Sequence, residues 1–95
     1  MILNIDSLQA GECVWCKTNT GSQYWFLLLG SLVASVYRQG KDEKFARFLE
    51  KRRLSNTMNC GDGFTMFDWN YHPISAIVPV EVCKVPASSI LLQKG

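Results

Sequence analysis

A chain of 95 residues, of which 47% are hydrophobic and 19% are charged, can form one domain around one core. A second domain is excluded because each half would bury too little surface, and wholesale disorder is excluded by the high apolar content. With a net charge of +2, the composition lies within the range of ordinary globular proteins. We therefore expect residues 1–95 to form a single domain.

The cysteine content, the N-terminal residues and the apolar segment 24–37 together indicate the cellular compartment. Four cysteines are too few for a small secreted scaffold that depends on disulfides, so reduced thiols are expected. Residues 1–6 lack the basic segment of a signal peptide, and the sequence contains no Asn-x-Ser/Thr glycosylation site. The apolar residues 24–37 would span only about 21 Å as a helix, against about 30 Å for a bilayer core. These features predict a cytoplasmic protein that does not enter a membrane.

The first half of the chain carries three strand patterns. Residues 12–18 are rich in β-branched and aromatic residues, and the turn signal at residues 19–22 contains Gly21. Residues 23–29 and 32–37 follow as strands on either side of a second turn. Because residues 23–29 are apolar on both faces, that strand requires cover on both sides.

Residues 41–53 carry the pattern of the single helix that the sequence predicts. Phe45, Phe48 and Leu49 recur at i, i+3 and i+4, which is the spacing of an apolar stripe along a helix. Acidic residues lie in the first turn of this segment and basic residues in its last turn, as the helix dipole favours.

The second half of the chain again favours strands. Residues 55–63 are polar and contain glycines, which indicates a loop, and residues 64–69 resume an extended pattern. Residues 74–85 alternate with period two, and Pro79 among them lacks an N–H, which indicates an edge strand or a bulge. Residues 88–93 predict a last short strand.

Together these patterns predict a mainly β (α+β) fold. We expect a small antiparallel sheet or partly closed barrel of five to six short strands, with one helix inserted at about residues 41–53. An α+β sheet with the helix packed on one face is the alternative.

The four cysteines equal in number the ligands of a tetrahedral zinc site. Cys13 and Cys16 form a C-x-x-C motif, but residues i and i+3 of a strand face opposite sides, so the motif does not present both sulfurs to one metal. Cys60 and Cys83 belong to no second such motif. We therefore expect structural thiols, no metal and no cofactor.

No reaction is identified by a motif. His72 is the single histidine, so a nucleophile arrangement would have to pair it with Cys60 or Cys83, and no local signature accompanies any of the three. Asp62 and Asp68 form a possible carboxylate pair, but Asp62 lies in a Gly-Asp-Gly turn that favours aspartate for local reasons. We therefore expect no enzyme.

Positive charge is concentrated on residues 41–53, which contain six cations and three anions. Such a face attracts phosphate or an acidic protein, although it is also what a solvated helix exterior looks like. Hydroxyls of the turn at residues 18–22 can add to an anion site. The candidate anion-binding residues are Lys44, Arg47, Lys51, Arg52, Arg53, Thr20 and Ser22.

Aromatic residues make up 12% of the chain, more than one small core needs to hide. A surplus at the surface would mark an interface. The candidate interface residues lie on the strand that is apolar on both faces and in the turn after the extended segment 64–69: Trp25, Leu27, Leu29, Trp69 and Tyr71.

These observations favour a non-catalytic interaction protein that self-associates, as a homodimer or higher homo-oligomer, and binds another macromolecule. Inhibitors that phages and mobile elements direct against host systems are one class of this kind. The alternative is a module that binds nucleotide or single-stranded nucleic acid through the basic segment 41–53 and exposed aromatic residues.

Overall fold

The computed structural model describes residues 2–93, which form nine strands and two short 3-10 helices. In chain order the elements are β1 (Ile2–Asn4), η1 (Ile5–Ser7), β2 (Cys13–Thr18), β3 (Gln23–Gly30), β4 (Val33–Gln39), β5 (Arg47–Leu54), β6 (Thr57–Asn59), β7 (Phe64–Phe67), β8 (Pro73–Ile77), β9 (Pro79–Val85) and η2 (Ala87–Ser89). No helix within residues 2–93 is long and apolar enough to cross a membrane.

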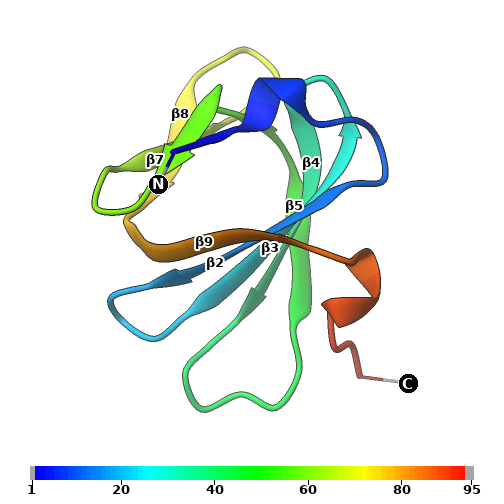
Figure 1. Cartoon of the computed structure of the whole chain (residues 1–95), viewed down its shortest axis with the longest axis vertical. Helices are drawn as coiled ribbons and strands as arrows, with labels where there is room; N and C mark the ends of the chain where they lie inside the picture. The colour runs from blue at the N-terminus through cyan, green and yellow to red at the C-terminus, as the bar shows by residue number, and fades with distance from the viewer. Residues whose placement is uncertain (1, 94–95) are drawn as a thin grey trace.

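Seven of the strands form one antiparallel sheet in the order β8-β7-β5-β4-β3-β2-β9, and β1 pairs with β6 in a separate ribbon. The two edge strands of the large sheet, β8 and β9, are consecutive in the chain and are separated only by Val78. Since one residue spans less than about 4 Å, the sheet must curl until its edges approach each other. The result is a half-barrel (Figure 1).

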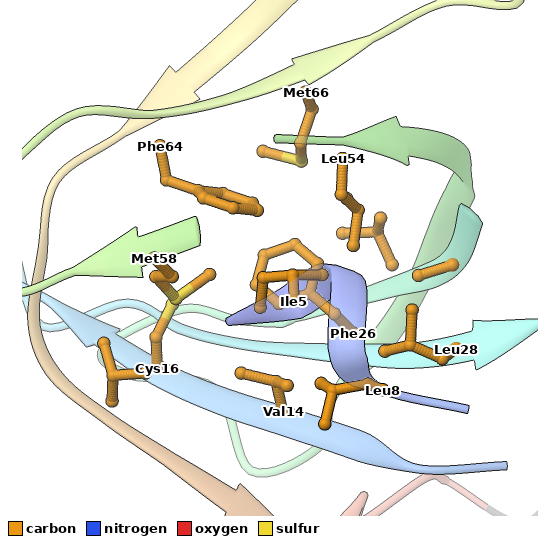
Figure 2. Close-up of a cluster of buried hydrophobic side chains, with 13 residues drawn as sticks. Ile5, Leu8, Val14, Cys16, Phe26, Leu28, Leu54, Met58, Phe64 and Met66 are labelled. Atoms are coloured by element: carbon orange, nitrogen blue, oxygen red, sulfur yellow. The ribbon is translucent and has the colours of Figure 1, made fainter. Parts of the chain in front are cut away.

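The concave face of the half-barrel holds the main core. The ribbon of β1 and β6, together with η1, covers this face, so that Ile5 and Met58 lie among side chains of the large sheet (Figure 2). At the centre, the rings of Phe26 and Phe64 meet edge to face with centroids 5.4 Å apart. The principal members of this core are Ile5, Leu8, Val14, Cys16, Phe26, Leu28, Leu54, Met58, Phe64 and Met66.

A smaller hydrophobic cluster lies on the convex face of the sheet and covers the second face of β3. Trp25 is buried there against Cys13 and Ala46, and Ile90 from the C-terminal segment packs on the same cluster. The backbone N–H of Ala46 donates to the carbonyl of Leu91 at 2.8 Å, which ties the C-terminal segment to the residue preceding β5. The chain itself therefore supplies part of the cover that β3 requires on its outer side.

The expected antiparallel sheet and partly closed barrel are confirmed, and the three strands expected in the first half are present as β2, β3 and β4. Gly21 lies in the β2–β3 turn with φ +88°, a conformation that costs glycine little. Pro79 begins the edge strand β9, and the β2–β9 register shifts opposite it. The interpretation of Pro79 as an edge or bulge residue is thus confirmed on both counts.

The predicted helix at residues 41–53 is wrong: residues 41–46 form turns and an isolated bridge, and residues 47–54 form β5. Phe45, Phe48 and Leu49 are all exposed, so their helical spacing does not mark one buried stripe. A helix here would also leave the outer edge of β4 without hydrogen-bond partners, and β5 pairs with β4 from Val33 to Arg38.

Three smaller expectations are also corrected, and with β5 in place of the helix and the unexpected β1, residues 2–93 contain nine strands and not five or six. The single strand expected at residues 74–85 is two strands that break at Val78, and the expected loop at residues 55–63 contains β6. The last expected strand is the 3-10 helix η2 followed by a bridge from Leu92 to Ala46.

Candidate functional site

Arg53, near the end of β5, lies against two aromatic rings of the β7–β8 loop. Its guanidinium carbon lies 5.2 Å from the centroid of the Trp69 ring and 4.4 Å from that of Tyr71. Its Nη1 donates a hydrogen bond to the Tyr71 hydroxyl at 3.0 Å. We call these three residues the Arg53 cluster. They meet because β5 pairs with β7 at Arg53 and Phe67, so that the loop that follows β7 lies beside the end of β5.

The loop that carries Trp69 and Tyr71 is held by the Asp68 carboxylate. Its Oδ1 accepts hydrogen bonds from the backbone N–H groups of Asn70 at 2.8 Å and His72 at 2.9 Å, and Nδ1 of His72 lies 3.3 Å from Oδ2. The His72 N–H, followed by that of Asn70, lowers the pKa of Asp68 because both bonds favour the ionised form. This small aspartate-centred turn fixes where the two aromatic side chains emerge.

A cavity of about 440 Å³ opens beside the Arg53 cluster, and its lining includes Ser31, Leu32, Arg53, Asn56, Phe67 and Tyr71. Within residues 2–93, Leu32 (φ +56°) and Tyr71 (φ +62°) are the two non-glycine residues with positive φ, and both line this cavity. Bulky side chains rarely adopt this conformation, which costs of order 1–3 kcal/mol, and such strain collects at functional sites.

Arg53 also carries an unsatisfied donor. Its Nε is buried and has no hydrogen-bond partner among the residues that the structure describes. A buried donor without a partner costs about 1–3 kcal/mol. The planar guanidinium suits a carboxylate, a phosphate or a backbone carbonyl.

The remaining candidate anion-binding residues do not join the Arg53 cluster. Arg47 pairs with Glu43 at 3.3 Å, Arg52 pairs with Glu50, and Lys44 and Lys51 are exposed. Because successive residues of a strand point to opposite faces, β5 divides its cations between the two sides of the sheet. A helix would have gathered them on one side, which was the basis of the basic face expected from the sequence.

Thr20 and Ser22 serve the β2–β3 turn. The hydroxyls of Thr18 and Thr20 lie 2.9 Å apart, and buried Ser22 accepts a hydrogen bond from Nη2 of Arg38 at 2.9 Å. Their hydroxyls are thus already engaged within the chain.

The candidate interface residues fall into two groups. Trp69 and Tyr71 are 51% and 66% exposed and belong to the Arg53 cluster. On β3, Trp25 is buried at 5% exposure, Leu27 is half-buried in the convex cluster, and Leu29 is 44% exposed. Of the β3 group, Leu29 is therefore the side chain most accessible to a partner.

The two thiols of the C-x-x-C motif lie on opposite faces of the sheet, and Cys60 packs against the same concave core as Cys16. Cys13 belongs to the convex cluster and Cys16 to the concave core, as expected for residues i and i+3 of a strand. Burial raises the pKa of Cys13 to about 11 and that of Cys16 to about 12, so both are protonated at neutral pH. Residues 2–93 contain no group of three or more His, Cys, Asp or Glu side chains placed to hold a metal ion.

The candidate catalytic residues are engaged in turns. His72 lies beside Asp68, and Asp62 accepts a hydrogen bond from the side-chain amide of Asn59 at 2.8 Å. Both aspartates thus serve local turn structure, and neither is paired with the other.

No protein-family model, no curated protein and no solved structure matches this chain. The site is therefore defined by its own geometry. From the sequence, Arg53 was a candidate for anion binding and Trp69 and Tyr71 were candidates for an interface, but nothing connected them. Leu32 was missed altogether, because its role depends on a backbone conformation that no residue pattern announced.

Proposed function

We propose that this protein is a non-catalytic binding protein, and that the Arg53 cluster is the centre of its interface with another protein. The observation that carries this proposal is the stacking of Arg53 on exposed Trp69 and Tyr71 beside the cavity. Arg, Trp and Tyr are the side chains that most often dominate binding energy at protein interfaces.

The backbone of Tyr71 supports the same proposal. A tyrosine that is 66% exposed contributes little burial to folding, yet it occupies a conformation that glycine or asparagine would adopt at lower cost. Within the chain, the Tyr71 side chain contacts Arg53 through its ring and its hydroxyl, and much of the ring stays open to a partner. Presentation of the ring to a partner gives a reason for a tyrosine at this position.

Single-stranded nucleic acid or a nucleotide is the second candidate ligand. Exposed aromatic rings beside an arginine are also a platform on which bases stack. The division of the β5 cations between two faces, two of them in ion pairs, argues against a continuous track for a phosphate backbone. We therefore rank this candidate below a protein partner.

We also propose that the chain self-associates. The described chain exposes twelve large hydrophobic side chains, and Leu29, Val78 and Val80 are among them. A second copy is one way to cover such residues.

A capture experiment with the full chain tests the proposed function. Wild-type protein, Trp69→Ala and Arg53→Lys are immobilised and exposed to extract from the source cells, with and without nuclease, and Phe45→Ala serves as a matched control. We expect specific protein capture that survives nuclease, falls at least about tenfold in the two cluster variants and persists in the control. In parallel, anisotropy with a labelled single-stranded oligonucleotide measures the second candidate directly. Capture that nuclease abolishes, or capture that is unchanged in the two cluster variants, would contradict the protein-interface proposal.

A further inference from the structure

The first part of β5, residues 47–52, has an unpaired backbone edge in the described part of the chain. One side of β5 pairs with β4, whereas on the other side β7 reaches only Arg53 and Leu54. The C-terminal segment makes one bridge at Ala46, which precedes this stretch. An unpaired strand edge is a template on which another strand can form.

A groove of about 250 Å³ lies beside this edge and leads into the half-barrel. Leu49, Glu50 and Arg52 of β5 contribute to it, while β8 contributes the uncharged residues Ser75, Ala76 and Ile77. Tyr24 and Met66, which belong to the concave side of the sheet, also line it. A strand laid along β5 would therefore rest one row of its side chains on a mostly apolar surface that also contains Glu50 and Arg52.

A bulge directs β5 toward this groove. The β4–β5 register shifts so that Val36 pairs with Glu50 and Tyr37 with Phe48, which leaves Leu49 as the extra residue. A bulge re-aims side chains and is common at the edges of sheets. In a regular strand, Leu49 and Glu50 would face opposite sides, but both line the groove.

The charge of β5 indicates which kind of segment would bind along its open edge. Residues 47–52 carry three cations and one anion, a net charge of +2, and the β8 residues of the groove carry no charge. Arg47 pairs with Glu43 and Arg52 with Glu50, so Lys51 is the cation of this stretch outside these two ion pairs. A second copy that paired through its own β5 would set these cations against one another, which is destabilising. An acidic segment would instead meet complementary charge along the strand.

We propose that residues 47–52 of β5 and the adjoining groove bind an extended, acidic segment of a partner protein, which adds to the sheet as a further strand. Main-chain hydrogen bonds to β5 provide affinity, and alternate side chains of the segment enter the groove or meet the cations. The groove shares no lining residue with the cavity beside the Arg53 cluster, so the two proposals are tested by separate variants.

The probe for this site is a blocked synthetic peptide of about eight residues that alternates glutamate and valine, compared with one that alternates lysine and valine. We expect the acidic peptide to bind at least about tenfold more tightly. Amide hydrogen exchange of residues 47–52 should slow on binding, because their outward groups become hydrogen-bonded. N-methylation of alternate peptide amides should abolish binding when it blocks the edge facing β5 and spare binding when it blocks the other edge.

Two substitutions on β8 locate the site. Ala76→Glu places a carboxylate in the groove and should weaken the acidic peptide at least about tenfold, whereas Ile74→Glu, an exposed residue of β8 outside the groove lining, should not. Tyr71→Gly should leave peptide binding unchanged, which separates this site from the Arg53 cluster. The proposal is overturned if the lysine peptide binds as well, if neither peptide binds, or if the β5 amides stay unprotected. It is also overturned if those amides are protected by dimerisation of the chain without peptide.

Discussion

The backbone of Tyr71 has a positive φ, which costs stability, while its ring is exposed to a partner. We predict that Tyr71→Gly raises the free energy of unfolding by about 1 kcal/mol relative to Tyr71→Ala, because alanine keeps the strain of positive φ and glycine relieves it. Urea denaturation of the two variants measures the difference. Both variants should lose capture of the partner. Equal stability of the two would show that the backbone at this position is not strained.

The thiols differ in reactivity because their burial differs. We predict that a thiol reagent at neutral pH modifies exposed Cys83 in the native protein and reaches Cys13 and Cys16 only on unfolding, since these two are buried and protonated. Mass spectrometry after timed labelling identifies the modified residues. Rapid native labelling of Cys16 would contradict its place in the core.

Burial of Cys16 also makes the folded state less stable at alkaline pH. Its pKa rises from the ordinary 9.0 to about 12, so the folded state retains its proton where the unfolded state loses it. The contribution of the protonated Cys16 thiol to folding stability is complete below about pH 9 and is lost as the pH rises toward the pKa of the folded state. We predict a smaller alkaline loss of stability in Cys16→Ala than in the wild type, measured as urea midpoints at about pH 8 and about pH 10. Parallel pH curves would refute it.

At the scale of elements, the β7–β8 loop depends on one carboxylate. The pKa of Asp68 is below its usual 3.8, so its stabilisation is present above pH 3.8 and is lost as the pH falls through the lower folded value. We predict that acidification through this window, or Asp68→Ala at neutral pH, releases the amides of Asn70 and His72 and shifts the Trp69 indole resonance. NMR spectra across the pH range provide the measurement. Unchanged amides in Asp68→Ala would mean that the turn holds without its carboxylate.

At the scale of the whole molecule, Phe26 of β3 and Phe64 of β7 join two distant strands of the curled sheet across the concave core. The Phe26 ring is fully buried and meets the Phe64 ring edge to face. We predict that Phe26→Ala lowers the free energy of unfolding by about 3–5 kcal/mol, a large part of the stability of a domain this size. Phe26→Leu should cost clearly less. Chemical denaturation followed by circular dichroism tests both, and a loss under about 1 kcal/mol would contradict the central position of the ring.

Self-association is also a property of the whole molecule. We predict that Leu29→Asp reduces the mass of the wild-type oligomer without unfolding the chain, because Leu29 is exposed. By contrast, Leu27→Asp should unfold it, because a carboxylate buried in the convex cluster without a partner costs several kcal/mol. Light scattering and circular dichroism separate the two effects. A wild-type mass of one chain at micromolar concentration would contradict self-association.

The sequence by itself determined the β class and the first three long strands. It could do so because alternation of side chains and a glycine turn are local signals, and β2, β3 and β4 are joined by short turns that keep neighbours in sequence adjacent in the sheet. The position of Pro79 on an edge strand or at a bulge was equally predictable, since a residue without an N–H is restricted to such positions in a sheet.

Only the tertiary structure decided the conformation of residues 47–54 and the composition of the site. β5 is largely exposed and bulged, so its side chains do not alternate between a buried and an exposed face, and its pairing with the edge of β4 makes it a strand. Arg53 meets Trp69 and Tyr71 because β5 pairs with β7 across the intervening β6, a long-range pairing that no local pattern encodes. The physical reason is the same in both cases: backbone hydrogen bonds between distant segments override weak local preference.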